Sequence, residues 1–553
     1  MSKRKKTRNI NSYMSQDNIV SSVILMIILL FAWTWTMIVN KNGLQGASYF
    51  FTVYDLILVL MVSIPYTLKS VIASAVKRRI DQKLYRSAKG ILNAGLLLAI
   101  LYSIAVILLI YIFAGSLTQS VLTGSKSHLT LIILTLSILF YSIACALMGY
   151  FEGLGESFHV LILITYLVSH LVMAVSTVIF SHIFMIRGSK VAEVLGNRET
   201  RYAYGAAGAA VGMLIGMIVL CIVILFMYQF YGVYIRKLMR KDTSKRTTDT
   251  VDLVIRLVRK TLPLAGSYLM ILLYQVIDQL IFFRIIPDKN EIILQTYRWG
   301  AYTGIYRGVM IFPLIIVFVL ALCEKTKLSM SFNSGDSHNV RILSQRIIKD
   351  NMIIALFFAA LFLVMADKIV AGIFKTESAL AVRLIRFGCI GLVLMALSVT
   401  FLVILSALGR LHGTFFAGLL ALIANIITAY VSIRYMSMGV FGAMLSFMIF
   451  GLVYSAIGIR FLRRAVKGRI DMRKTFYLPV IAAAIIIVVM LILSLLLGLF
   501  LPPIINVILT AILSFIGYFA ILVKLDVISE YTIASFPFSE LLMKLGKIMG
   551  LFR

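Results

Sequence analysis

Long apolar runs recur along the whole 553-residue chain, and they constrain its fold more than any other feature. A helix that crosses the hydrocarbon core of a bilayer needs about 20 mostly apolar residues. Lipid offers the backbone no hydrogen-bonding partners, so such runs have to be helices, whereas barrel strands would be short and alternating. The runs here are continuous, and 61% of the residues are hydrophobic. The sequence therefore predicts an all-α polytopic membrane protein.

About fourteen membrane-spanning helices are predicted. A signal peptide would have a shorter apolar region and a small-residue cleavage site, so the first run is expected to be a retained helix. The predicted spans are 19–39, 47–73, 90–115, 128–150, 158–186, 203–231, 261–286, 298–323, 351–366, 383–408, 414–433, 439–462, 476–499 and 504–523.

The distribution of basic residues predicts the orientation of these spans. Of the 53 Lys and Arg residues, 37 lie in segments on the same side as the N-terminus. Basic loops stay in the cytoplasm, so this asymmetry predicts a cell-membrane protein with both termini cytoplasmic. The net charge of +31 follows membrane topology, since no loop is long enough to be a folded domain, and no nucleic-acid partner is expected.

Weak internal similarity predicts two six-helix lobes. The turn after span four reads FEGLGESFHV and the turn after span ten reads ILSALGRLHG, while Pro65 in span two matches Pro313 in span eight. Six is an even number, so the two repeats would be parallel, as in many secondary transporters with a substrate path between bundles. The expected organisation is a basic arm (1–18), an N-lobe (19–231), a basic linker (232–260), a C-lobe (261–475), two extra helices (476–523) and an amphipathic cytoplasmic tail (524–553).

Signatures of catalysis and of metal binding are missing from the sequence. It has no G-x-x-x-x-G-K-[ST], H-E-x-x-H or G-x-S-x-G motif, and its four cysteines lack metal-ligand spacing. The prediction is therefore a protein that is not an enzyme and uses no cofactor or metal, with its cysteines buried as small apolar groups.

Ionisable side chains at membrane depth are the candidates for function, because they are costly there and mark polar pathways. Arg307 and Asp55 each lie close to the bilayer midplane, Arg307 about 14 Å into its span. These two side chains could simply pair with each other. The alternative that we favour is a water-filled cationic cavity that binds a phosphate or diphosphate through charge-assisted hydrogen bonds.

The other candidates each have a structural alternative. His170 is either a cavity residue or a satisfied core histidine, and Asn425 is either a site residue or a helix–helix contact. Lys69 and Arg298 lie near span ends, where a long side chain can extend its charge to the interface. The complete set of predicted substrate-binding residues is Arg307, Asp55, Arg284, Asp278, His170, Asn425, Lys69 and Arg298.

The ordered segments resemble a known superfamily. They are NGLQGASYFFTVYDLILVL, GYFEGLGES, AAGAAVGMLIG, TLPLAGSYLMILLYQVIDQLI, GIYRGVMIFPLIIVFVLAL and SALGRLHGTFFAGLLALIANIITAYV. The chain resembles the multidrug/oligosaccharidyl-lipid/polysaccharide exporter (MOP) superfamily, in particular the polysaccharide flippase branch with the stage V sporulation protein B-like proteins. The resemblance implies an inverted-V pair of six-helix lobes and flipping of polyprenyl-diphosphate-linked saccharides. It maps the charged cavity of the family onto Asp278, Arg284 and Arg307.

Three functions remain open at this point. The first is a flippase that moves lipid-linked saccharide precursors by alternating access, with that saccharide and membrane lipids as partners. The second is a cation-coupled multidrug exporter, which would need a carboxylate such as Asp55 or Asp278 to bind Na⁺ or H⁺. The third is a non-transporting scaffold whose partners would be proteins of polysaccharide synthesis.

Overall fold

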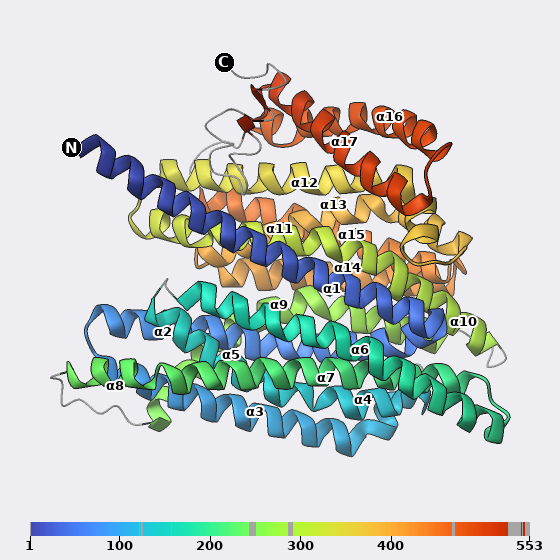
Figure 1. Cartoon of the computed structure of the whole chain (residues 1–553), viewed down its shortest axis with the longest axis horizontal. Helices are drawn as coiled ribbons and strands as arrows, with labels where there is room; N and C mark the ends of the chain where they lie inside the picture. The colour runs from blue at the N-terminus through green and yellow to red at the C-terminus, as the bar shows by residue number, and fades with distance from the viewer. Residues whose placement is uncertain are drawn as a thin grey trace. The chain divides into compact units, whose positions relative to one another are not determined.

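The computed structural model describes residues 2–120, 122, 125–155, 158–242, 250–285, 291–466, 471–528, 543–544 and 546–547, with side chains from residue 20. Every regular element in these ranges is a helix (Figure 1). The α-helices are α1 (Ser2–Met61), α2 (Thr67–Asp81), α3 (Tyr85–Ser120), α4 (His128–Thr135), α5 (Ser137–Leu154), α6 (His159–Leu195), α7 (Glu199–Phe230), α8 (Gly232–Arg240), α9 (Thr250–Ile285), α10 (Ile292–Gly300), α11 (Arg307–Asn333), α12 (Ser337–Gly372), α13 (Ala379–Ala407), α14 (Leu411–Arg434), α15 (Val440–Ala465), α16 (Leu478–Gly498) and α17 (Pro503–Lys524). Short π-helical segments are η1 (Val62–Tyr66), η5 (Ala301–Tyr306) and η6 (Arg473–Tyr477), and η2 (Ser125–Ser127) is a 3₁₀ turn.

The prediction of an all-α protein with about fourteen spans is confirmed. In the described part of the chain, 13 helical stretches are long and apolar enough to cross a membrane. The first of them, Val20–Asp81, holds two of the predicted spans. These two spans meet at Gly43, whose φ of 65° breaks the helical path and suits a residue without a side chain. The protein is therefore a multi-pass membrane protein.

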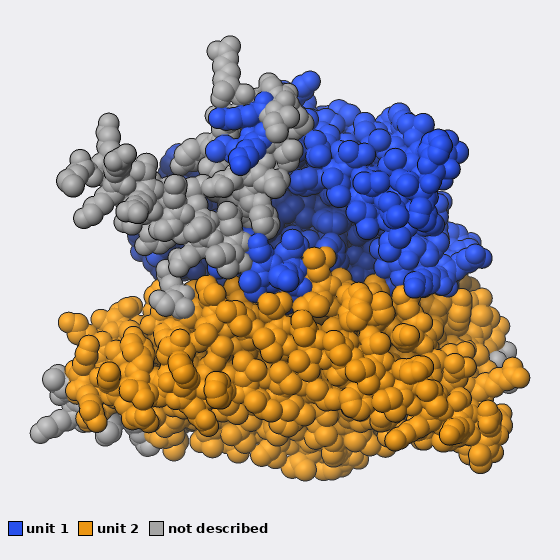
Figure 2. All heavy atoms as spheres, in the orientation of Figure 1, with its two compact units in different colours: residues 1–28, 305–424, 444–553 blue, residues 29–304, 425–443 orange. Residues whose placement is uncertain are grey.

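The chain divides into two compact units, which Figure 2 colours separately. Unit 1 comprises residues 1–28, 305–424 and 444–553, and unit 2 comprises residues 29–304 and 425–443. The core of unit 2 is built from buried apolar side chains of α2, α3, α5 and α9, with Leu220 and Ile224 of α7. In unit 1, α11, α12 and α13 pack on one another, and α16 and α17 pack together against α12 (Figure 1).

Glycines in α7 allow this helix to pack closely on α6 in unit 2, as their spacing of four residues predicts. A Cβ at Gly212 would collide with the Thr177 backbone of α6. A Cβ at Gly216 would lie 2.5 Å from the Cβ of Met173, also on α6. The missing side chains therefore let α7 lie directly on α6.

A proline interrupts the second span, as its missing N–H predicts. Pro65 lies in η1, where the backbone widens to a π-helical turn. The carbonyl oxygen of Leu60, five residues earlier, instead accepts a hydrogen bond of 2.8 Å from the Tyr102 hydroxyl. Single π-helical turns of this kind occur frequently at functional sites.

The predicted amphipathic helix in the tail (524–553) lies almost entirely outside the described residues. The division into an N-lobe, a linker and a C-lobe remains a prediction.

Candidate functional site

Two glycines near the end of α5 bring this helix into close contact with α2. A Cβ at Gly149 would lie 2.5 Å from the carbonyl oxygen of Lys69. A Cβ at Gly153 would lie 2.6 Å from the Cβ of Val76, about two turns further along α2. Glu152 lies between these glycines, so the small residues that join the helices also place its carboxylate beside α2.

Lys69 and Glu152 form an ion pair at this contact. The Nζ of Lys69 lies 3.3 Å from Oε2 of Glu152, and the two side chains are 15% and 36% exposed. The same Nζ lies 5.8 Å from the ring centroid of Tyr166 on α6, within the range of a cation–π interaction. The Lys69 charge is therefore held inside unit 2 by an acidic and an aromatic partner.

Further polar side chains surround this pair. Tyr66 and Cys145 lie within electrostatic range of the Lys69 ammonium. The ring of Tyr66 meets the ring of Tyr268 on α9 edge-on, with centroids 5.7 Å apart. Tyr141 on α5 lies within hydrogen-bonding range of Cys145. Residues of η1, α2, α5, α6 and α9 thus form one polar cluster, which we call the Lys69 cluster: Tyr66, Lys69, Tyr141, Cys145, Glu152, Tyr166 and Tyr268.

A cavity of about 180 Å³ adjoins the Lys69 cluster, because Tyr141 and Tyr166 belong to both. His170 lines this cavity from α6. Its Nδ1 lies 2.8 Å from the carbonyl oxygen of Tyr166, which can only accept, so Nδ1 carries a proton. In the neutral ring Nε2 is then left as an acceptor. The walls also contain Met61, Met173, Met213 and Met217, whose flexible side chains fill irregular space.

Two other predicted site residues meet each other in unit 2. Nδ2 of Asn425 on α14 donates to Oδ2 of Asp278 on α9 over 3.3 Å. Both residues are buried, Asp278 with 1% and Asn425 with 0% exposure. A carboxylate and an amide thus face each other across two helices that are far apart in the sequence.

The remaining predicted residues have different surroundings. Asp55 on α1 is fully buried in unit 2, and Arg307, the first residue of α11, is buried in unit 1. Arg284 is exposed near the end of α9, and Arg298 on α10 is half-buried. Of the eight predicted residues, the described contacts bring together Asp278 and Asn425, and Lys69 and His170 share Tyr166 as a neighbour.

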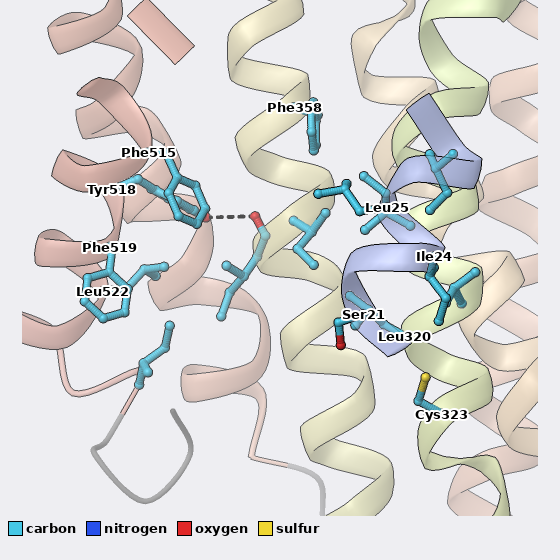
Figure 3. A pocket seen from close by; sticks show the side chains of 16 residues that line it. Ser21, Ile24, Leu25, Leu320, Cys323, Phe358, Phe515, Tyr518, Phe519 and Leu522 are labelled. Atoms are coloured by element: carbon cyan, nitrogen blue, oxygen red, sulfur yellow. Dashed lines mark hydrogen bonds between the residues drawn. The ribbon is translucent and has the colours of Figure 1, made fainter. Parts of the chain in front are cut away.

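Unit 1 contains a larger, apolar cavity of about 420 Å³ (Figure 3). Its walls come from α1, α11, α12 and α17, and all lining side chains except Ser21, Cys323 and Tyr518 are hydrocarbon. The Tyr518 hydroxyl donates to the carbonyl oxygen of Ile353 over 3.3 Å, so it is satisfied within the wall. We call this cavity the apolar groove.

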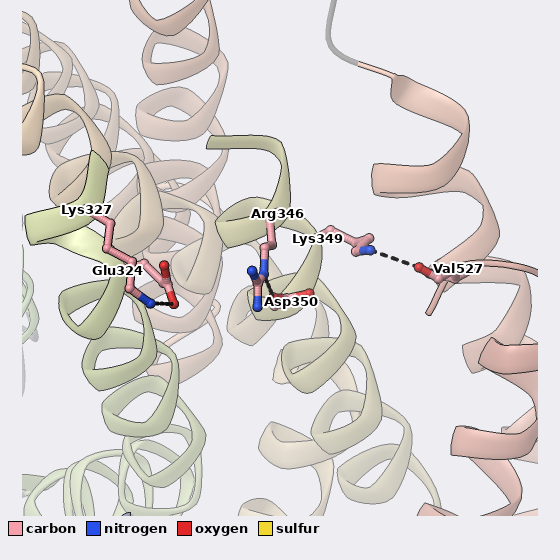
Figure 4. Close-up of polar contacts among 6 residues, drawn as sticks. All are labelled: Glu324, Lys327, Arg346, Lys349, Asp350 and Val527. Carbon is pink, nitrogen blue, oxygen red and sulfur yellow. Dashed lines mark hydrogen bonds and ion pairs between the residues drawn. The ribbon is translucent and has the colours of Figure 1, made fainter. Parts of the chain in front are cut away.

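Polar contacts near two separate points of α12 attach α16 and the segment after α17 to this helix. At one point, Lys349 donates to the carbonyl oxygen of Val527 over 2.8 Å (Figure 4). Nearby, Lys474 pairs with Asp526 at 2.7 Å, and this ammonium holds the pKa of Asp526 below its ordinary value of 3.8. At the other point, Lys368 donates to the Ser494 hydroxyl over 2.7 Å. Lys349 therefore attaches the segment that follows α17 to α12, and Lys368 attaches α16 to α12.

Comparison with known proteins places the chain in a family. Residues 50–322 match the model of the family described as "Polysaccharide biosynthesis protein". This segment contains both the Lys69 cluster and Asp278, and its match agrees with the all-helical fold. The match covers just under half of the chain and supports a place on the polysaccharide branch of the MOP superfamily. No curated protein matches the chain.

Solved structures of MOP transporters share the fold. The chain is similar to an inward-facing multidrug resistance MATE family transporter of the MOP superfamily, with a TM-score of 0.60, 16% identity, and coverage of 81% of this chain and 98% of that one. For a eukaryotic MATE transporter the TM-score is 0.59 and the sequence identity is 13%, and the match covers 86% of this chain and 99% of that one. The third structure is a MOP superfamily transporter from Pyrococcus furiosus that is described as having a binding pocket of reverse polarity. Its TM-score is 0.58 and its sequence identity is 16%, and the match covers 82% of this chain and 96% of that one. At these identities the likeness establishes the MATE-like fold alone.

Of the Lys69 cluster, only Lys69 is among the predicted site residues, and Glu152 is the acidic member that sequence reasoning missed. The predicted fourth span ended at residue 150, so Glu152 was assigned to a loop, whereas α5 continues to Leu154. The signal was present in GYFEGLGES: a carboxylate flanked by two glycines on one helical face. Small residues at this spacing mark close helix contacts in membranes, and a carboxylate between them needs a partner.

Proposed function

We propose that this MOP transporter flips lipid-linked saccharide precursors across the cell membrane by alternating access. The apolar groove is the observation that carries the choice of substrate. A hydrocarbon-lined cavity suits a lipid carrier, because such a carrier brings an apolar chain that has to lie against the protein during transport.

The charged residues suit the other end of such a substrate. Arg307 and Lys69 supply buried cationic groups, and guanidinium and ammonium groups bind phosphate through charge-assisted hydrogen bonds. In this proposal, Arg284, Arg298 and the Lys69 cluster of unit 2 contact the diphosphate and sugar, and Arg307 of unit 1 is required for translocation. The basic segments face the cytoplasm, with both termini on that side, because basic loops are retained there.

A variant of the apolar groove tests the role of the lipid chain. Leu320→Trp adds bulk to the groove wall, whereas Leu495→Trp adds the same bulk on α16 at a side chain that is 71% exposed. In proteoliposomes that carry a fluorescent polyprenyl-diphosphate oligosaccharide, we expect Leu320→Trp to slow translocation at least several-fold and Leu495→Trp to leave it unchanged. Equal rates for both variants would remove the groove from the pathway.

A second candidate, a cation-coupled exporter, is favoured by the contact between Asp278 and Asn425. Carboxylate and amide oxygens suit hard cations, and a buried carboxylate also suits a proton. Asp278→Asn should then abolish the response of transport to an imposed Na⁺ or H⁺ gradient, while a variant of exposed Asp367 should not. A coupled efflux of organic cations without movement of lipid-linked saccharide would favour this function over the flippase.

A further inference from the structure

The ion pair between Lys69 and Glu152 is loosely made. A charge-assisted N–H···O contact is ordinarily about 2.7–2.9 Å long, whereas this one is 3.3 Å. The Lys69 ammonium has three N–H donors. Among the described residues, its close partners are the Glu152 carboxylate and the face of the Tyr166 ring, which takes no conventional hydrogen bond. The ammonium therefore keeps capacity for a second anionic partner.

Without the ion pair to Lys69, the position of Glu152 would be unfavourable for a carboxylate. Glu152 lies in the last turn of α5, which ends at Leu154 and is followed by Gly155 with a φ of 151°. The C-terminal end of a helix carries a partial negative charge, which repels a carboxylate. The Glu152 side chain is also more than twice as exposed as that of Lys69, at 36% against 15%. Lys69 is therefore the fixed member of the pair and Glu152 the one that can move.

We propose that Glu152 is an internal counter-ion that neutralises Lys69 until a phosphoryl anion of the substrate displaces it. This inference rests on the proposed flippase function and adds a regulating residue to its site. In the empty protein, the carboxylate removes the cost of a lone buried charge, which is high in a membrane interior. When a diphosphate arrives, Lys69 exchanges one anion for another, and Glu152 turns toward its exposed side.

The surroundings of Lys69 suit a phosphoryl group as the competing anion. The tyrosines of the Lys69 cluster carry hydroxyl donors, and a phosphate offers several acceptor oxygens. The adjoining cavity of about 180 Å³ is lined by two of these tyrosines, Tyr141 and Tyr166, together with Ser169 and His170. An anion at Lys69 would therefore have neutral donors nearby once Glu152 has moved.

Binding of soluble anions to the purified full-length protein in detergent tests this exchange without requiring transport. The probes are farnesyl diphosphate and inorganic pyrophosphate, measured by titration calorimetry. Glu152→Gln keeps the shape of the side chain and removes its charge, so both probes should bind about tenfold more tightly, equivalent to about 1.4 kcal/mol. Lys69→Met should weaken binding by at least a similar factor. Glu324→Gln is the matched control, because Glu324 pairs with Lys327 at 3.1 Å in unit 1, and it should leave the affinity unchanged.

Three results would overturn the proposal. One is an unchanged affinity in Glu152→Gln with a lowered melting temperature, which would mean a purely structural pair. Another is a double variant, Lys69→Glu/Glu152→Lys, that binds the diphosphate probes as tightly as the wild type. This exchange restores a structural ion pair but moves the ammonium group to the other helix. The third is tightening for phosphatidylglycerol in nanodiscs without tightening for either diphosphate, which would assign Lys69 to a lipid headgroup.

The outcome can be separated from that of the proposed function. Tighter diphosphate binding in Glu152→Gln together with no wild-type translocation of lipid-linked saccharide would support the counter-ion and reject the flippase. Translocation by the wild type, together with a diphosphate affinity that does not depend on Glu152, would support the flippase and reject the counter-ion.

Discussion

Replacing Gly149 by alanine should separate α5 from α2 and break the Lys69 cluster. The added Cβ would lie 2.5 Å from the carbonyl oxygen of Lys69 and 3.1 Å from its Cα. Comfortable contacts between heavy atoms begin at about 3.5 Å, so the helices have to move apart by about 1 Å. The obstructing atoms belong to the backbone of a helix and cannot turn away.

The magnitude follows from two opposed effects. Overpacking of this kind costs about 1–3 kcal/mol. Alanine in a helix recovers about 0.5–1 kcal/mol relative to glycine. The net expectation is a destabilisation of about 0–2.5 kcal/mol, centred near 1 kcal/mol. A displacement of about 1 Å also takes the 3.3 Å contact between Lys69 and Glu152 beyond the 4 Å limit of an ion pair.

The assay is thermal unfolding of the purified variant in detergent, followed by translocation in proteoliposomes. Gly115→Ala on α3 is the control, since a Cβ there meets nothing within 4 Å. Gly149→Ala should melt at a lower temperature and translocate more slowly, while Gly115→Ala should match or slightly exceed the wild type in stability. An unchanged Gly149→Ala in both measurements would refute the close packing of α2 and α5.

Three further predictions concern the attachment of α16 and α17 to α12. Lys349→Met should increase amide hydrogen exchange at the end of α17, because the hydrogen bond to the Val527 carbonyl is lost. Lys327→Met is the control, because its side chain is 61% exposed, and it should leave the exchange unchanged. Equal exchange in both variants would contradict the attachment of this segment by Lys349. Asp526→Asn should lower thermal stability at neutral pH. Because pairing with Lys474 lowers the pKa of Asp526, the stabilisation is present above the ordinary pKa of 3.8 and is lost as the pH falls through the lowered value, so the difference between variant and wild type should vanish in strong acid. Lys368→Met should make the segment between α16 and α17 more sensitive to proteolysis, because the hydrogen bonds to Ser494 are lost. Sensitivity equal to that of the wild type would contradict the attachment of α16 to α12 by Lys368.

The membrane fold could be predicted from the sequence because lipid imposes a single solution on a long apolar run. The continuous hydrophobicity of 476–499 needs no tertiary context, and α16 occupies Leu478–Gly498. The same reasoning predicts two separate spans on either side of Gly43, and the helical path of α1 does break at this residue. Helix ends were less accurate, since polar residues such as Glu152 extend a helix beyond its apolar run.

The pairing of side chains could be predicted only in part, since it depends on how helices rotate and pack. Asp278 and Asn425 were both candidates by depth, but their 3.3 Å contact comes from α9 and α14, 147 residues apart. Lys69 was assigned to the end of its span, where a lysine can extend to the interface. In the structure α2 continues to Asp81, twelve residues or about 18 Å beyond Lys69, and the ammonium pairs with Glu152 of α5, a contact that the sequence does not predict.

The flippase claim is tested most directly by translocation of a fluorescent polyprenyl-diphosphate oligosaccharide in proteoliposomes, read as its accessibility to an outside quencher over time. We expect wild-type protein to expose the substrate progressively and Arg307→Ala, normally inserted and equally stable, to lose that activity. No translocation in either direction, with or without an imposed potential or ion gradient, would contradict the account and direct the next measurement to cation efflux.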